Sequence, residues 1–273
     1  MYNNTCKTIG VLSHDFSHPQ TAMLLQEANR QLNARGCAAL LIDATAEERA
    51  RQLAPLLSAA LHLSGRFSDA FRAAAGPIPL VALDTLNQDG FTAGEEMGRL
   101  LLAQGHQRFG YLQLASCADP ARLDGFGSVL AAADKPLGHS LIACDTGDER
   151  DSGYQAMLAY LKRARASERI QALFCDSDRL AFGALQAVRD FGQGAHVAVV
   201  GFGDCHEAGT STWHLTSWAQ PHALRITEAL NRLLLNRAQE DGAWRRGELR
   251  VRHSHQGKAA LGEMGQCGCA IRH

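Results

Sequence analysis

Short apolar runs of strand length alternate with segments of helical period along most of this chain, and this alternation constrains the fold more than any other feature. The first pair is "KTIGVLS", residues 7–13, followed by a segment at 19–35 with apolar positions 23, 24, 25, 28 and 32. Pro19 opens that segment and Gly36 follows it, as expected for a helix. Repeated strand–helix alternation is typical of parallel sheets covered by helices on both faces.

The same alternation continues through the rest of the chain. Helices are predicted around 47–60, 90–104, 120–133, 151–164, 178–190 and 221–237. Strands are predicted at 38–43, 61–65, 79–84, 109–114, 140–145, 172–176, 196–202, 215–218 and 247–252. At least nine strands in 273 residues fit two sheets better than one. The fold class expected is therefore α/β, with two parallel-sheet lobes, and the best boundary between them is "LASCADP" at 114–120.

Charge and cysteine usage exclude several classes of protein. The chain has 27 Lys and Arg against 28 Asp and Glu. Its net charge therefore gives no reason to expect that the protein binds nucleic acid or an anionic membrane. No apolar run reaches the roughly 18–20 residues of a membrane helix, and no export signal is visible at the N-terminus. Eight scattered cysteines favour reduced packing residues over a disulfide framework. A cytoplasmic protein is expected.

Ligands of open α/β sheets sit at the carboxyl ends of the strands, so the residues that follow each strand are candidates for a binding site. Most of them carry a hydroxyl or a carboxylate, with a single cation: Ser13, His14, Asp15, Arg66, Asp84, Ser116, Asp145, Ser177, Asp178 and Asp204. Such a set suits a small polyhydroxylated or acidic molecule. Any single Ser or Asp among them could instead cap a helix.

The stretch "VAVVGFGDCHEAG", residues 197–209, ends a strand in glycines without matching a nucleotide motif. A dinucleotide fingerprint needs glycine where His206 stands, and no Gly-Lys-Ser/Thr phosphate loop occurs anywhere. Gly203 is better explained by a tight turn or by backbone close to a ligand. No Gly-x-Ser-x-Gly elbow is present either, so hydrolysis by a serine has little support. We expect a non-enzymatic protein that needs no cofactor.

Five segments occur in the order and spacing of the lactose/galactose-repressor (LacI/GalR) family. They are "TIGVLSHDFSHPQTAMLLQEANRQLNARG", "GRLLLAQGHQRFGYLQ", "ARLDGF", "ALFCDSDRLAFGALQAV" and "VAVVGFGD…LTSWAQP", within residues 8–255. The chain resembles the effector-sensing core of that family, which shares the fold of periplasmic sugar-binding proteins. The resemblance implies two doubly wound lobes joined by three crossovers, a small-molecule effector between them, and a homodimer. The lobes expected are residues 1–115 with 220–245 and residues 116–219 with 246–260, followed by a tail at 261–273.

The resemblance also assigns ligand-binding roles to residues of this chain. Arg122 matches an arginine that relatives aim at effector hydroxyls or carboxylate, and an alanine variant is expected to lose ligand binding while keeping the fold. Asp148 stands where relatives carry a stacking aromatic, which counts against a purine-like effector. The ligand-binding residues expected, with the strand-end candidates included, are Asp15, Arg66, Ser116, Arg122, Asp148, Ser177, Asp204 and Gln220.

Where this chain departs from the family, the effector class is affected. Many relatives have two acids after the glycine and aromatic, whereas here Gly203 takes the first place and Asp204 the second. The glycine in place of the first acid removes a negative charge that would repel an anionic effector. In addition, the segments "FCDSD" and "GFGD" resemble the gluconate-type branch of the family. A sugar or a sugar acid is therefore the expected effector.

Because residues 1–6 alone precede the first strand, this chain is expected to lack the helix-turn-helix head of family regulators, and operator DNA is expected to be bound only through such a head. The chain is expected to be the sensing core of a longer repressor or a headless relative. A solute-binding protein for sugar uptake and an enzyme on a similar frame are the alternatives. A zinc site is not expected, although five residues near the end could supply ligands: His253, His255, Cys267, Cys269 and His273.

Overall fold

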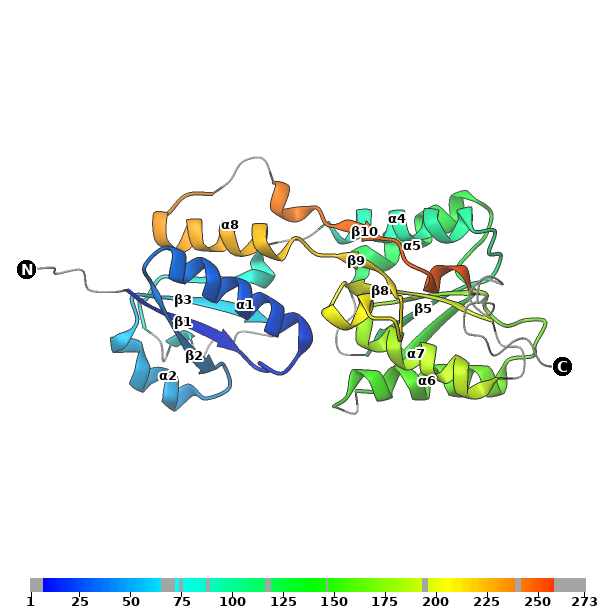
Figure 1. Ribbon diagram of the computed structural model, residues 1–273, viewed down its shortest axis with the longest axis horizontal. Coiled ribbons are helices and arrows are strands. Elements are labelled where there is room, and N and C mark those ends of the chain that lie inside the picture. Colours follow the sequence, from blue (N-terminus) through cyan, green and yellow to red (C-terminus); the bar gives the residue numbers. More distant parts are fainter. Residues whose placement is uncertain are drawn as a thin grey trace, which may run out of the picture. The chain divides into compact units, whose positions relative to one another are not determined.

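The chain folds into two compact units, each built on one sheet (Figure 1). The computed structural model describes residues 7–64, 72–73, 76–86, 89–115, 119–145, 147–192, 196–238 and 242–257. Unit 1 comprises Met1–Gln88 and Pro221–Gly247, and unit 2 comprises Asp89–Gln220 and Glu248–His273. The chain thus passes between the units three times, as the resemblance implied.

Unit 1 is a parallel sheet in the order β2-β1-β3-β4 with helices on both faces. Ile9 and Val11 point toward α1 (Pro19–Ala34) and α8 (His222–Leu235), where they join a buried cluster with Leu32 of α1 and Leu230 of α8. Leu12 and Ile42 point to the other face, where α2 (Glu47–Leu53) lies. The strands are β1 (Thr8–Ser13), β2 (Ala38–Asp43), β3 (Ala59–Ser64) and β4 (Leu80–Ala82).

Unit 2 contains the larger sheet, in the order β10-β9-β8-β7-β5-β6. Figure 1 shows α4 and α5 on one face and α6 and α7 on the other. The strands are β5 (Phe109–Leu114), β6 (His139–Ala143), β7 (Ala172–Cys175), β8 (Ala198–Gly203), β9 (Thr216–Ala219) and β10 (Glu248–Arg250). The helices are α4 (Gly90–Ala103), α5 (Pro120–Ala132), α6 (Glu149–Arg163) and α7 (Asp178–Phe191). Aromatic rings of Tyr111, Phe126 and Phe174 pack against one another at the centre of the α4–α5 side.

Glycines allow the helices on each face of this sheet to approach closely. A Cβ on Gly94 of α4 would lie against the carbonyl oxygen of Arg122 and 2.6 Å from the nitrogen of Phe126, both in α5. Gly183 of α7 meets the carbonyl of Arg150 in α6 in the same way. Because these contacts are with backbone, no side-chain rotation can relieve them.

The structure corrects the expected lobe boundaries. Helix α4 and strand β5 belong to unit 2, because β5 pairs with β6 and β7 inside its sheet and α4 packs on α5. The first boundary therefore follows Gln88 rather than residue 115, and Gln220 closes a segment of unit 2 rather than opening one of unit 1. The last strand, β10, runs antiparallel to β9, so the sheet is not wholly parallel. Within the described residues, no helix is long and apolar enough to cross a membrane.

Candidate functional site

The carboxyl edge of the unit 2 sheet brings together five of the residues predicted to bind ligand. Ser177 follows β7, Asp204 follows β8, Asp148 lies at the start of α6, and Arg122 lies in the first turns of α5. Strands β5, β6, β7, β8 and β9 are mutually parallel, so all of them end at this edge. Gln220, which follows β9, lies at the same edge and is half-buried.

Arg122 is the centre of a polar cluster in which its charge is already balanced. One guanidinium nitrogen, Nη1, contacts Oδ1 of Asp176 and donates to the Asp176 carbonyl at 3.0 Å. The other, Nη2, lies 3.1 Å from Oδ2 of Asp119. The ring of Phe202 lies under the guanidinium, with its centroid 3.5 Å from Cζ. The side chains of Arg122 and Asp176 are only 9% and 7% exposed.

Tyr111 completes this cluster from β5 by donating its hydroxyl to Oδ1 of Asp176 at 2.6 Å. Burial raises the pKa of the Asp176 carboxyl, whereas the charge of Arg122 and the Tyr111 hydrogen bond act in the opposite direction. Burial also raises the pKa of Tyr111, so the phenol keeps its proton. A buried charge that loses its partner is costly. These contacts lead us to expect that an alanine at position 122 also destabilises the fold, which the sequence alone did not indicate.

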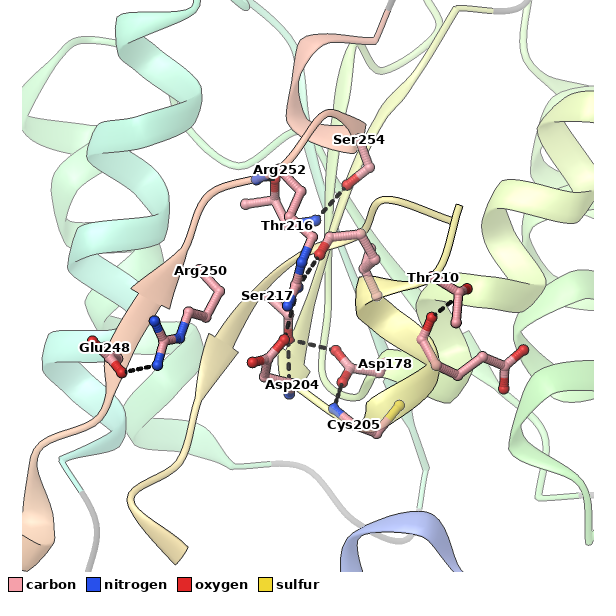
Figure 2. A network of polar contacts seen from close by, with 12 residues as sticks. Asp178, Asp204, Cys205, Thr210, Thr216, Ser217, Glu248, Arg250, Arg252 and Ser254 are labelled. Carbon is pink, nitrogen blue, oxygen red and sulfur yellow. Dashed lines mark hydrogen bonds and ion pairs between the residues drawn. The ribbon is translucent and has the colours of Figure 1, made fainter. Parts of the chain in front are cut away.

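A second polar network surrounds Asp178, the first residue of α7 (Figure 2). Its carboxylate accepts from the Ser217 hydroxyl at 2.5 Å and from the Cys205 backbone nitrogen at 2.7 Å. The Ser217 oxygen in turn accepts from the backbone nitrogen of Asp204 at 3.0 Å. The Asp204 carboxylate forms an ion pair with Arg252, at 2.7 Å from Nη1. These contacts fix the turn that follows β8.

Two glycines make this turn sterically possible. Gly203 has a φ of 123°, which only glycine adopts readily. Asp204 follows with a φ of 49°, in the left-handed region that Asp tolerates. A Cβ on Gly201 would collide with Oδ1 of Asp178, so the close approach of that carboxylate to β8 requires glycine.

The buried carboxyl of Asp178 predicts a measurable pH dependence of stability. Burial raises its pKa to about 6 from the usual 3.8, against the lowering effect of the Ser217 and Cys205 hydrogen bonds. A carboxyl whose folded pKa is raised stabilises the fold below its unfolded pKa and loses that contribution as pH rises through the folded value. Between pH 4 and pH 7 the wild type should therefore lose about 1–3 kcal/mol relative to Asp178→Asn. Urea unfolding of both proteins across this range checks it, and a constant difference would contradict it.

Asp148 and Ser177 both cap helices, the structural alternative left open for such residues. Asp148 is the N-cap of α6, accepts from the Arg150 nitrogen at 2.8 Å and pairs with Arg179 at 2.8 Å. The Arg179 hydrogen bond lowers the pKa of this carboxyl. Ser177 is the N-cap of α7, accepts from the Leu180 nitrogen, and donates to Glu149 Oε2 at 2.7 Å. A cap remains able to contact a ligand with its exposed side, so the binding roles of both residues stay predictions.

In unit 1, Asp15 follows β1 and is exposed. It accepts from the nitrogen and the hydroxyl of Ser17, at 2.8 and 2.6 Å, and these bonds lower its pKa. Beside it, the hydroxyl of Ser64 lies 2.9 Å from those of both Ser13 and Thr21. Hydroxyl groups therefore gather at the carboxyl ends of β1 and β3, and of the three only Ser13 was a candidate from the sequence.

The structure also shows where the remaining candidates stand. Arg66 and Ser116 lie outside the described residues, as do Cys267, Cys269 and His273. Within the described part of the chain, no group of three His, Cys, Asp or Glu side chains could hold a metal ion. Sequence reasoning missed Asp176 and Arg252. Asp176 directly follows β7, so its position at a strand end was a usable signal, whereas nothing in the sequence links Arg252 to Asp204.

Comparisons with known proteins identify the family to which the segment carrying these residues is similar. Residues 99–254, more than half of the chain, match the model of the periplasmic binding protein-like domain. The HTH-type transcriptional repressor PurR of Yersinia pestis (strain Pestoides F) is 31% identical over 159 residues, which are 56% of this chain and 45% of that repressor. The chain thus spans about half the length of the curated relatives it matches.

Solved structures show the same fold. A LacI family transcriptional regulator from Enterococcus faecium with bound ribose is 21% identical, with a TM-score of 0.72 over 91% of this chain and 98% of that one. The lac repressor dimer bound to operator and an anti-inducer is 16% identical, with a TM-score of 0.75 over 93% of this chain and 82% of that one. The two α/β units and the match over residues 99–254 show that this chain belongs to the periplasmic binding protein-like domain family.

Proposed function

We propose that this chain is the effector-sensing part of a LacI-type transcription regulator, and that it binds a sugar or a sugar acid. The observation that carries the proposal is that four polar residues follow the strands at the carboxyl edge of the unit 2 sheet: Arg122, Asp176, Ser177 and Asp204. This edge is where open α/β sheets bind ligands, and it lies inside the segment that matches the family. The ribose bound to the Enterococcus faecium regulator supports a sugar as the ligand class.

The remaining parts of the proposal rest on the relatives. PurR is a transcriptional repressor and the lac repressor structure is a dimer on its operator. We infer that this chain acts within a homodimer in the cytoplasm, and that operator DNA is bound by a head outside these residues. An effector changes DNA affinity only by the difference in its binding to the two states of the regulator, typically ~1–3 kcal/mol. The similarity of "FCDSD" and "GFGD" to the gluconate-type branch is the reason to test sugar acids beside neutral sugars.

A thermal-shift panel of neutral sugars, sugar acids and nucleobases tests the proposal. A ligand present at about 100 times its dissociation constant should add ~2.7 kcal/mol to the free energy of unfolding. Asp134→Asn, a substitution at an exposed position in the turn that follows α5, is the control and should respond like the wild type. Stabilisation by nucleobases alone, or chemical turnover of a bound sugar, would contradict the proposal.

A further inference from the structure

Three arginines of unit 2 are already matched with carboxylates of the chain itself. Arg122 contacts Asp176, Arg179 contacts Asp148 and Arg252 contacts Asp204. Arg122 has a second carboxylate, that of Asp119, on its other terminal nitrogen. An anionic ligand could contact the remaining N–H groups, such as the Nε of Arg122 and of Arg179, which have no partner among the described residues, but it would become the counter-ion of a guanidinium only by displacing one of these carboxylates.

For Arg122 such displacement is especially unfavourable. Its side chain and that of Asp176 are more than nine-tenths buried, and a displaced Asp176 would lose both Arg122 and the Tyr111 hydroxyl. A carboxylate without its partners is costly at low dielectric. A ligand carboxylate would also lie next to that of Asp176, and two like charges at one site oppose each other.

Two oxygen atoms at this edge, Oδ2 of Asp176 and Oε1 of Gln113, accept no hydrogen bond from the described residues. Oδ1 of Asp176 takes both the Tyr111 and the Arg122 hydrogen bonds, and none of the described residues donates to Oδ2. Oε1 of Gln113 is buried without a partner among the described residues. Leu112 is paired with Cys175, so the next step along both strands sets Gln113 and Asp176 side by side on one face of the sheet. A ligand that satisfies these oxygens must donate hydrogen bonds.

We propose that Asp176 is the specificity-determining residue of this site: it neutralises Arg122 and accepts a hydroxyl of a neutral polyhydroxylated ligand, so that the carboxylated form of the same ligand is rejected. This inference rests on the proposed function and narrows its ligand class from sugar or sugar acid to neutral sugar.

Matched pairs of ligands that differ only in a carboxylate test the selectivity. Glucose and gluconate, galactose and galactonate, and ribose and ribonate are titrated calorimetrically into the wild type, Asp176→Asn and the control Asp134→Asn. In any pair that binds, the wild type and the control should prefer the neutral member by at least about tenfold in dissociation constant. Asp176→Asn should lower that preference by about tenfold or reverse it, because the charge of Arg122 then lacks its counter-ion.

A second measurement tests the pairing of Arg122 and Asp176 without any sugar. Asp176→Ala removes the carboxylate and leaves space beside Arg122, so formate should raise the unfolding temperature of this variant above its value in chloride at equal ionic strength. Wild type and Asp134→Ala should show no such difference. If Asp176→Ala does not fold, the calorimetric series with Asp176→Asn decides alone.

The outcomes separate the two proposals. If the wild type prefers the acid member of a pair, and Asp176→Asn leaves that preference unchanged, the role of Asp176 is refuted while the sensing function stands. If no pair binds but formate rescues Asp176→Ala, the sugar-sensing proposal fails and the counter-ion role of Asp176 holds. Absence of both binding and rescue overturns both.

Discussion

Replacing Arg122 with methionine is expected to lower the free energy of unfolding of unit 2 by about 3–5 kcal/mol, because the variant leaves the buried Asp176 carboxylate without its counter-charge. Methionine keeps most of the apolar stem over the Phe202 ring, so the loss reports chiefly on the charge. Urea unfolding measures the effect, with equal m-values showing that the unfolded state is unchanged.

A double variant distinguishes loss of the partner from loss of packing. When Arg122→Met is combined with Asp176→Leu, no carboxylate remains to be desolvated, and much of the lost stability should return. Arg99→Met is the matched control, since Arg99 pairs with Glu95 on the surface of α4 and is 58% exposed. That control should change stability by less than about 1 kcal/mol. A double variant as unstable as Arg122→Met alone would assign the effect to packing.

The alternation of apolar runs predicted the order of most strands and helices, but the helix expected at 47–60 ends at Leu53, and Ala59 and Ala60 belong to β3. The boundary between the units was not predictable in the same way. The segment "FGYLQL" of β5 has the composition of a buried strand in either sheet, and only its pairing with β6 and β7 assigns it to unit 2. Pairing depends on residues far away in sequence, which local pattern does not report.

The site was partly predictable for a related reason. Rules about strand ends and the family resemblance led to Arg122, Ser177 and Asp204, which the structure brings to one edge. They gave no information about which charges pair. Arg122 could have been a free cation for a ligand carboxylate, but Asp176 occupies that position in the structure. The neighbour of a charged group decides its chemistry, and that neighbour comes from another element.

The glycines of α4 also show which features the sequence predicts and which only the structure identifies. Gly90, Gly94 and Gly98 recur every fourth residue, so they form one stripe along the helix. The spacing indicates a face able to approach another backbone, but it does not identify the partner. The partner is α5, whose Gly125 in turn lies against the carbonyl oxygen of Phe91. Helix α5 carries Arg122, so the closeness of this helix pair also positions the polar cluster.

Gly94→Ala is therefore expected to lower the free energy of unfolding by about 2–4 kcal/mol, although alanine favours a helix more than glycine does. The new methyl group would meet the carbonyl of Arg122 and the nitrogen of Phe126, so α4 and α5 would have to separate. Overpacking against backbone is not relieved by a rotamer change.

The control for this variant is the same substitution on the adjacent helix. Gly127 lies in α5, and a Cβ there meets nothing within 4 Å, so Gly127→Ala should raise stability by up to about 1 kcal/mol. Opposite signs for two identical substitutions exclude helix propensity as the cause. Because separation of the helices moves Arg122 away from Asp176, Gly94→Ala should also weaken sugar binding, whereas Gly127→Ala should not. Equal stability and equal binding in the two variants would show that the helices do not need this contact.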